Sequence, residues 1–125
     1  MKIFGFIPAR MGSKRFYGKP LKKIRDKPML EHVFERAKMF KGWDSLVVAT
    51  CDKEIKKFAK QKKYDCVMTS KRHKRCLDRI YEAANRRHKK IKNEDLIVCV
   101  QGDEPMLHPK MIKTVLKPFF RKKKI

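Results

Sequence analysis

The sequence has no apolar run that approaches the ~18 residues needed to cross a bilayer. This excludes a membrane-spanning helix of the usual kind, so no membrane partner is expected. The apolar segment at residues 3–7 reaches about half of a signal peptide's upper core length, and it runs directly into a basic loop. We therefore interpret this segment as a strand and predict a cytoplasmic protein.

Cysteine is scarce, and its spacing points to no metal site. The four cysteines form no CxxC pair, and Cys66 and Cys99 lie in strand-like runs, where cysteine behaves as a small hydrophobic residue. His73 and Cys76 could offer two ligands, but a structural zinc site needs about four and no second pair stands at a suitable interval. The pattern is typical of a reduced protein without a zinc site.

Acidic residues are few: 13 stand against 35 basic residues, which gives a net charge of +22. Such an excess suggests a nucleic-acid partner, because lysines that neutralise phosphates release counterions. The lysines, however, are spread over nearly every expected helix, and aromatic residues do not alternate with them as base stacking requires. We favour a solvated lysine-rich surface with no specific nucleic-acid partner. A lysine-rich nucleic-acid-binding module is kept as an alternative.

The sequence does contain a regular alternation of strand-like and helix-like segments. Apolar or β-branched runs predict strands at 2–7, 46–50, 66–69 and 96–100. Apolar residues at helical spacing predict four helices between and after them. Their expected inner faces are Leu30, Val33, Phe34 and Ala37; Ile55, Phe58 and Ala59; Leu77, Ile80, Tyr81 and Ala84; and Met111, Ile112, Val115 and Leu116.

Two residues are expected to bound these helices: Gly42 as the stop of the first, and Asp52 as the N-cap of the second. Strands separated by helices of this length give right-handed crossovers and a mostly parallel sheet. We therefore predict one α/β domain over residues 1–125, with a Rossmann-like, three-layer, nucleotide-binding fold.

Two segments carry candidate chemistry. The loop at residues 8–19 follows the first strand and holds Arg10, Lys14, Arg15 and Lys19 around two glycines. The strand at 96–100 runs directly into Gln-Gly-Asp-Glu-Pro at residues 101–105. If the two strands are neighbours, cations and carboxylates meet at the carboxyl edge of the sheet, where open α/β sheets bind ligands.

These residue types suit a metal and a polyphosphate. Arginine grips phosphate oxygens through its planar fork, lysine offers a compact charge, and a carboxylate suits a hard cation such as Mg²⁺. The loop is not a Walker A motif, because the glycine required before Gly12-Ser13-Lys14 is missing. A kinase-type P-loop is therefore disfavoured.

The same segments carry a resemblance. Ile7-Pro8-Ala9-Arg10, Gly18-Lys19-Pro20-Leu21, Lys27-Pro28-Met29 and the block at 101–105, together with Ser13 and Arg15, resemble the cytidylyltransferases that make CMP-Kdo. This compound is the activated eight-carbon sugar acid of Gram-negative lipopolysaccharide. Val48-Ala49-Thr50 and Met68-Thr69 extend the similarity along the chain. Proteins of that family are roughly twice this length, so the nucleotidyltransferase fold is expected to be truncated to its amino-terminal half.

The resemblance implies Mg²⁺-dependent transfer of CMP from CTP to Kdo or a similar 2-keto sugar acid, with release of pyrophosphate. It assigns catalysis to Arg10, Arg15, Lys19 and Asp103, with Asp103 as the metal ligand. It assigns CTP binding to Ala9, Arg10, Gly12, Ser13, Lys19, Arg75 and Gln101. Glu104 is interpreted as orienting the loop. A homodimer is expected at full length, and the 125-residue chain alone is expected to be inactive.

One segment departs from the family. The usual pattern is His, any residue, Ser-Gly-Thr, an acid and Arg, whereas residues 73–79 read His-Lys-Arg-Cys-Leu-Asp-Arg. Either the nucleotide loop is rebuilt around Arg75, or the sugar or base specificity has changed. Residues 9–13 and 77–79 also look like the spore-coat-polysaccharide type of sugar nucleotidyltransferase. That type is the alternative within the enzyme class.

Overall fold

A computed structural model describes residues 1–12, 18–73, 75–88, 91–101 and 109–122. The elements in chain order are β1 (Ile3–Ala9), the 3-10 helix η1 (Lys19–Leu21), β2 (Lys23–Ile24), β3 (Lys27–Pro28), α1 (Met29–Lys38), β4 (Ser45–Thr50), α2 (Lys53–Gln61), β5 (Asp65–Met68), α3 (Cys76–Arg87), β6 (Leu96–Cys99) and α4 (Pro109–Lys122). Among the helices in the described ranges, none has both the length and the hydropathy needed to cross a membrane.

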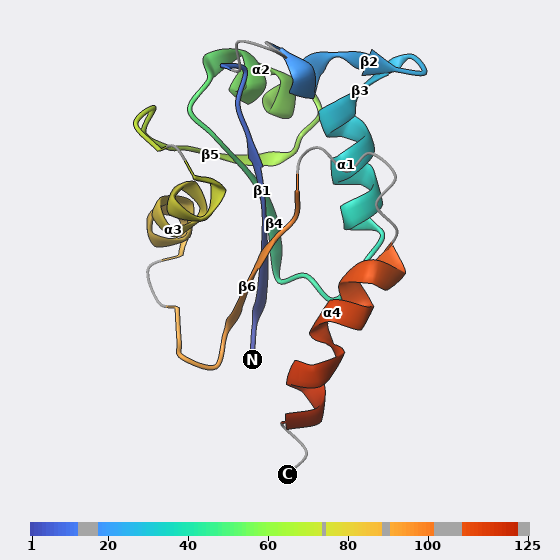
Figure 1. Cartoon of the computed structure of the whole chain (residues 1–125), viewed down its shortest axis with the longest axis vertical. Coiled ribbons are helices and arrows are strands. Elements are labelled where there is room, and N and C mark those ends of the chain that lie inside the picture. Colours follow the sequence, from blue (N-terminus) through green and yellow to red (C-terminus); the bar gives the residue numbers. More distant parts are fainter. Residues whose placement is uncertain (13–17, 74, 89–90, 102–108, 123–125) are drawn as a thin grey trace.

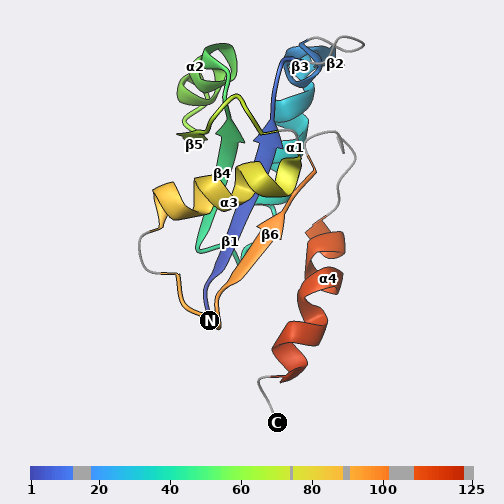
Figure 2. The ribbon, with the colours of Figure 1, turned by 60° about the vertical axis from the view of Figure 1, so that its left-hand side comes forward.

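The main sheet has four parallel strands in the order β5-β4-β1-β6 (Figure 1). Helix α3 packs on one face of this sheet, and α1, α2 and α4 pack on the other (Figure 2). The predicted mostly parallel, three-layer α/β fold is therefore confirmed. All four predicted strands exist, with ends that differ by one or two residues from those expected.

Strand β1 is the centre of the core because it is covered on both faces. Ile3 and Ile7 point into the cluster under α1, whereas Phe4 and Phe6 point into the cluster under α3. This alternation follows from the two-residue period of a strand. All seven residues of β1 are buried, as expected of a parallel strand between two helix layers.

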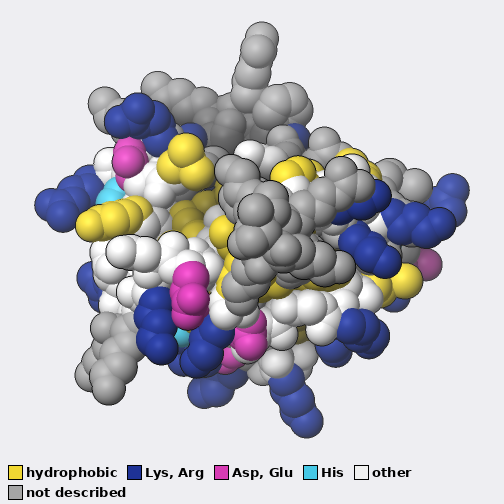
Figure 3. Space-filling view, turned by 90° about the horizontal axis from the view of Figure 1, so that it is seen from below, with side chains coloured by type: hydrophobic (Ala, Val, Ile, Leu, Met, Phe, Trp, Pro, Cys, Tyr) yellow, Lys and Arg dark blue, Asp and Glu magenta, His cyan; other side chains and the backbone are white. Residues whose placement is uncertain are grey.

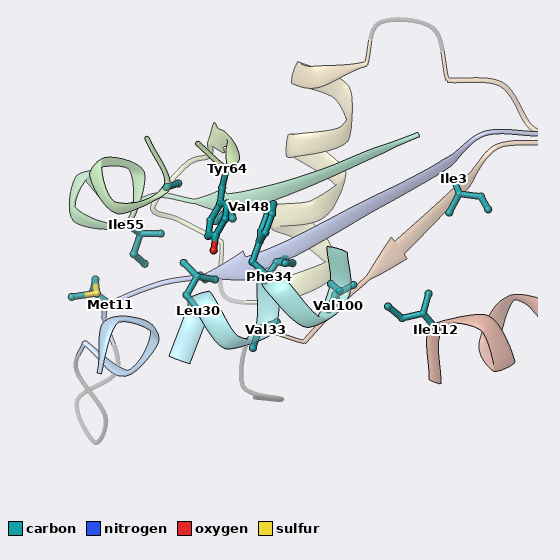
Figure 4. Close-up of a cluster of buried hydrophobic side chains, with 14 of the residues drawn as sticks. Ile3, Met11, Leu30, Val33, Phe34, Val48, Ile55, Tyr64, Val100 and Ile112 are labelled. Carbon is teal, nitrogen blue, oxygen red and sulfur yellow. The ribbon is translucent and has the colours of Figure 1, made fainter. Parts of the chain in front are cut away.

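The larger cluster joins three helices to the sheet (Figure 4). Leu30 of α1, Ile55 of α2 and Val48 of β4 are each 0% exposed. Burying one such side chain stabilises the fold by about 1.5–3 kcal/mol. The apolar positions predicted for α1 are all buried, which confirms its inner face.

Two other helices bury less than their sequences suggested. Leu77 and Tyr81 on α3 are 70% and 73% exposed, and Met111 and Val115 on α4 are 51% and 62% exposed. The prediction that these four side chains face the core was wrong. Helical spacing marks an apolar stripe, but the sheet contacts only part of it: Ile80, Ala83 and Ala84 on α3, and Ile112 and Leu116 on α4.

Two further local features differ from the expectation or were missed. Helix α1 ends at Lys38, so Gly42 does not stop it. A two-stranded antiparallel ribbon, β2 with β3, was not predicted. Arg25 and Asp26 connect its strands with φ values of 49° and 70°, which are typical of a tight hairpin turn. Neither residue is glycine, so the usual hairpin signal is absent from the sequence.

Gly5 in β1 provides space for Trp43. A Cβ atom at Gly5 would lie 2.7 Å from Cζ3 of Trp43 and 2.9 Å from Cδ1 of Leu46. The indole Nε1 of Trp43 donates to the carbonyl oxygen of Ala37 at 2.8 Å, which holds the ring in place. The connection between α1 and β4 therefore packs against β1 through Trp43.

We predict that Gly5→Ala lowers the free energy of unfolding by roughly 1–3 kcal/mol, because the added methyl group overpacks this contact. Gly12→Ala is the matched control, since a Cβ there meets nothing within 4 Å. Its effect should stay within about 0.5 kcal/mol. Urea denaturation followed by circular dichroism measures both, and equal stabilities for the two variants would contradict the prediction.

Candidate active site at the carboxyl edge of the sheet

The strands that precede the two candidate segments are neighbours in the sheet. Strands β1 and β6 are parallel neighbours, and the N–H of Val100 donates to the carbonyl oxygen of Phe6 at 2.9 Å. The condition set by the sequence, that these two strands be neighbours, is therefore met.

The structure places several predicted site residues at this edge. Ala9 is the last residue of β1 and is buried, while Arg10, Gly12 and Gln101 are exposed beyond the strand ends. Lys19 is half-buried in η1. Three predicted site residues lie outside the described residues: Ser13, Arg15 and Asp103.

A backbone hydrogen bond joins Gly18 to Met11 at the two ends of the loop after β1. The N–H of Gly18 donates to the carbonyl oxygen of Met11 at 3.0 Å, and Met11 itself is buried in the core. Gly18 has a φ of 79°, in the left-handed region that glycine adopts without steric cost. The closure brings η1, and with it Lys19, next to the end of β1.

Asp52 anchors this loop, a role that the sequence analysis missed. Its Oδ2 accepts a hydrogen bond from the N–H of Met11 at 2.8 Å. Asp52 does stand at the N-cap position of α2, but its side chain makes no capping hydrogen bond, which corrects the expectation. The carboxylate reaches Met11, which is 41 positions away in sequence, because β1 and β4 are neighbours. A carboxylate directly after a strand was the only available signal.

A second polar network holds the segment after β5. Arg79 is 3% exposed, and its guanidinium donates to Oγ1 of Thr69 at 2.8 Å and to the carbonyl oxygen of His73 at 3.3 Å. Oε1 of Glu82 accepts from the N–H of Ser70 at 3.1 Å and lies 2.6 Å from Nε2 of His73. This loop is therefore held by side chains from the first turns of α3.

Glu82 is a fixed anion in this network. Burial by itself would raise its pKa, but the hydrogen bonds from His73 and Ser70 and the charge of Arg86 outweigh it and hold the pKa below its ordinary value. Oε2 of Glu82 lies 2.6 Å from Nε of Arg86. Glu82 was not predicted, because one acid within a helix gives no signal in a single sequence.

Arg75 lies apart from the loop after β1. It precedes α3, and its Nε lies 3.3 Å from Oδ2 of Asp78 in an exposed ion pair. No hydrogen bond or ion pair joins it to residues 9–12 or 18–21. Its predicted role in CTP binding stays a prediction.

The described residues at this edge offer cations and polar groups. Within the described ranges, no group of three or more His, Cys, Asp and Glu side chains gathers to hold a metal ion. Arg10 and Lys19 can contact anionic oxygens, and the backbone around Gly12 and Gly18 permits close approach. Gln101 can present both a donor and an acceptor to a ligand.

We predict that Glu82→Gln weakens the pH dependence of stability on the acid side. The wild-type pKa lies below the ordinary value of 4.5, so the stabilisation by ionised Glu82 is complete above pH 4.5 and is lost as the pH falls through the lowered pKa. The variant has no such carboxylate. Between about pH 5 and pH 3 its free energy of unfolding should fall less steeply than that of the wild type. Urea titrations across this range measure the slopes, and identical slopes would refute the assignment.

Comparison with known proteins places these features in a family. A family model described as cytidylyltransferase matches residues 4–124. The chain is 44% identical over 119 residues to 3-deoxy-manno-octulosonate cytidylyltransferase 2 of Hydrogenovibrio crunogenus, which covers 95% of this chain and 47% of that protein. It is 42% identical over 121 residues to 8-amino-3,8-dideoxy-manno-octulosonate cytidylyltransferase of Shewanella oneidensis, which covers 97% of this chain and 49% of the relative.

A solved structure supports the same conclusion. The fold superposes with a TM-score of 0.88 and 34% identity on CMP:2-keto-3-deoxy-manno-octonic acid synthetase complexed with CTP, over 97% of this chain and 48% of that one. The chain thus spans about half the length of the relatives that it matches. On the strength of the family model and this shared fold, the chain belongs to the cytidylyltransferase family.

Proposed function

We propose that this chain supplies the nucleotide-binding half of an enzyme that transfers CMP from CTP to Kdo or a related 2-keto sugar acid. The observation that carries the proposal is the pairing of β1 with β6, which brings the basic loop and the Gln101 segment to one edge. The relatives named for this activity, and the CTP complex of the similar structure, support it.

In this reaction the anomeric hydroxyl of the sugar acid attacks the α-phosphorus of CTP. The new sugar O–P bond forms as the bond between the α and β phosphates breaks, and pyrophosphate leaves. We assign Arg10, Arg15 and Lys19 to the phosphate oxygens, where fixed cations stabilise the charge on the leaving group. Gln101 and the backbone around Gly12 and Ser13 are assigned to the nucleotide.

The proposal includes Mg²⁺ held by Asp103, four residues after the end of β6. A single carboxylate together with phosphate oxygens and water is a common ligand set for this hard cation. When bound, Mg²⁺ would supply charge stabilisation at the phosphate groups. Glu104 is assigned to orienting the loop.

We place the acceptor site, and any second metal carboxylate, in the half of the family's length that this chain does not match. Exposed apolar side chains near β6 support this: Ile97 on β6, and Met111 and Val115 on α4, are each more than 40% exposed. The 125-residue chain alone is therefore expected not to turn over. A homodimer and a cytoplasmic location also stay proposals.

The lysine-rich surface does not favour a nucleic-acid interface. On the face shown in Figure 3, Lys and Arg side chains are spread around the molecule and form no single stripe. A groove that tracks a phosphate backbone would gather them along one path. The alternative of a nucleic-acid-binding module therefore has the weaker support.

We predict that CTP with Mg²⁺ raises the melting temperature of this chain more than ATP, GTP or UTP does. A ligand that binds only the native state at 100 times its Kd adds about 2.7 kcal/mol to stability. Arg10→Ala should lose most of the shift, whereas Lys57→Ala, an exposed lysine on α2, should keep it. Equal shifts with all four nucleotides would remove the case for cytidine and favour the spore-coat-type transferase.

We further predict that Asp103→Asn abolishes the gain in CTP affinity that Mg²⁺ gives the wild type. A neutral amide of similar shape cannot bind the cation as a carboxylate does. Glu104→Gln is the matched control and should keep most of the gain. Isothermal titration with CTP, with and without Mg²⁺, measures the difference. An unchanged Mg²⁺ effect in the Asn variant would show that Asp103 is not the ligand.

A further inference from the structure

A pocket of about 630 Å³ lies at the amino edge of the sheet, away from the candidate active site. It is formed by the carboxyl ends of α1 and α2 and the first residues of β4 and β5. Ser45, at the start of β4, lines it, whereas Thr50 ends that strand at the opposite edge, about 17 Å away. Its volume falls within the ~300–1,000 Å³ that is typical of small-molecule sites.

Lysines predominate among the charged side chains that line this pocket. Four lysines line it: Lys38, Lys41, Lys62 and Lys63. Of these, Lys62 pairs with Glu31 at 2.8 Å, while the other three have no carboxylate within ion-pair distance in the described part of the chain. Asp65 is the one acidic lining residue, and its Oδ1 already pairs with Nη2 of Arg87 at 2.8 Å. Lys38, Lys41 and Lys63 thus line the pocket without an ion-pair partner among the described residues.

The aromatic side chains of the pocket are held in place. The ring of Tyr64 lies against that of Phe34 (Figure 4), and the two stack with centroids 3.7 Å apart. The hydroxyl of Tyr64 donates to Oε1 of Glu35 at 3.2 Å. Burial raises the pKa of Tyr64, so the phenol stays neutral. Trp43 is fixed by its bond to Ala37 and by its contact with Gly5. A ligand would therefore meet a rigid apolar wall, and little conformational entropy would be lost on binding.

The favourable interaction of a cation with the carboxyl end of a helix explains only some of the lysines in this pocket. Lys38 ends α1, where a cation offsets the partial charge of the last carbonyls. Lys41, in contrast, lies in the connection after α1. Lys63 follows α2 at a position with φ of 60°, where glycine is the usual residue, and the N–H of Tyr64 donates to the carbonyl oxygen of Ala59 at 2.8 Å. A lysine is thus placed at the pocket in a backbone conformation that glycine would adopt with less strain.

We propose that this pocket binds a small molecule with a diphosphate or triphosphate group, either inorganic pyrophosphate or a nucleoside polyphosphate. Within the described ranges, three lysines without ion-pair partners line the pocket, and lysine binds phosphate as a point charge. The wall of Trp43 and Tyr64 leaves an apolar surface for a base or another flat group. The site does not depend on the proposed transferase activity, because it lies at the other edge of the sheet.

Trp43 is the single tryptophan of the chain and lines the pocket, so its fluorescence reports on occupancy. The wild type is titrated with inorganic pyrophosphate and, separately, with ATP. We expect a saturable change in emission with at least one of them. Similar Kd values assign recognition to the phosphate group, and a response to ATP alone assigns it to a nucleoside-linked ligand. No saturable change with either would overturn the proposal.

Variants separate binding at the pocket from general charge effects. The double variant Lys41→Ala, Lys63→Gly should raise the Kd at least tenfold, and it should remain folded because glycine suits the left-handed position. Lys57→Ala removes one charge from the exposed face of α2 outside the pocket and should leave the Kd unchanged. An unchanged Kd in the double variant would overturn the proposal.

Binding of a single-stranded oligonucleotide to the wild type and to the double variant is measured as well. If the oligonucleotide binds more tightly than pyrophosphate and the double variant abolishes that binding, the pocket is part of a nucleic-acid interface and the small-molecule proposal is wrong. If the oligonucleotide binds equally to the wild type and to the double variant, its binding reflects the net charge of +22.

Discussion

The burial of β1 between two neighbouring strands is the constraint on which the rest of the structure depends. β1 pairs in parallel with β4 on one side and with β6 on the other, so its seven residues contact both helix layers. Parallel pairing brings the carboxyl ends of all three strands to one edge. Met11 and Asp52, which follow β1 and β4, are therefore in contact although they are 41 positions apart in sequence.

Four of the 13 acidic residues hold the backbone at the two edges of the sheet. At the amino edge, Asp44 accepts from the N–H of Ile3 at 2.6 Å, and Asp95 accepts from the N–H of Lys2 at 2.9 Å. At the carboxyl edge, Asp52 and Glu82 accept from backbone N–H groups of loops. Ionised acceptors make strong hydrogen bonds, and these anchors fix both ends of the central strands. Much of the basic surface is consequently left without an acidic partner.

This distribution gives the two edges different chemistry. At the carboxyl edge, cations stand in loops that are anchored by carboxylates and closed by Gly18. At the amino edge, lysines surround fixed aromatic rings. The free side of β6 differs from both, because apolar residues of α4 and β6 remain exposed beside it. An exposed strand edge with apolar neighbours is a surface that further chain can cover.

The sequence by itself determined the order and type of the main elements and the parallel sheet. These features follow from local periodicity and from the handedness of strand-helix-strand units, both of which are visible in one sequence. It also placed Ala9, Arg10 and Gln101 at the end of the strands where they are found.

Only the tertiary structure decided which side chains of each element are buried and which hydrogen bonds they make. Helical spacing could not show that Leu77 and Tyr81 would be exposed, because the extent of the contact depends on where α3 lies across the sheet. Asp52 is a plausible N-cap in sequence, yet its carboxylate accepts a hydrogen bond from the N–H of Met11 instead. The lysine-lined pocket joins residues from α1, β4, β5 and the connections between them, and no local pattern records a site that exists only when those segments pack together.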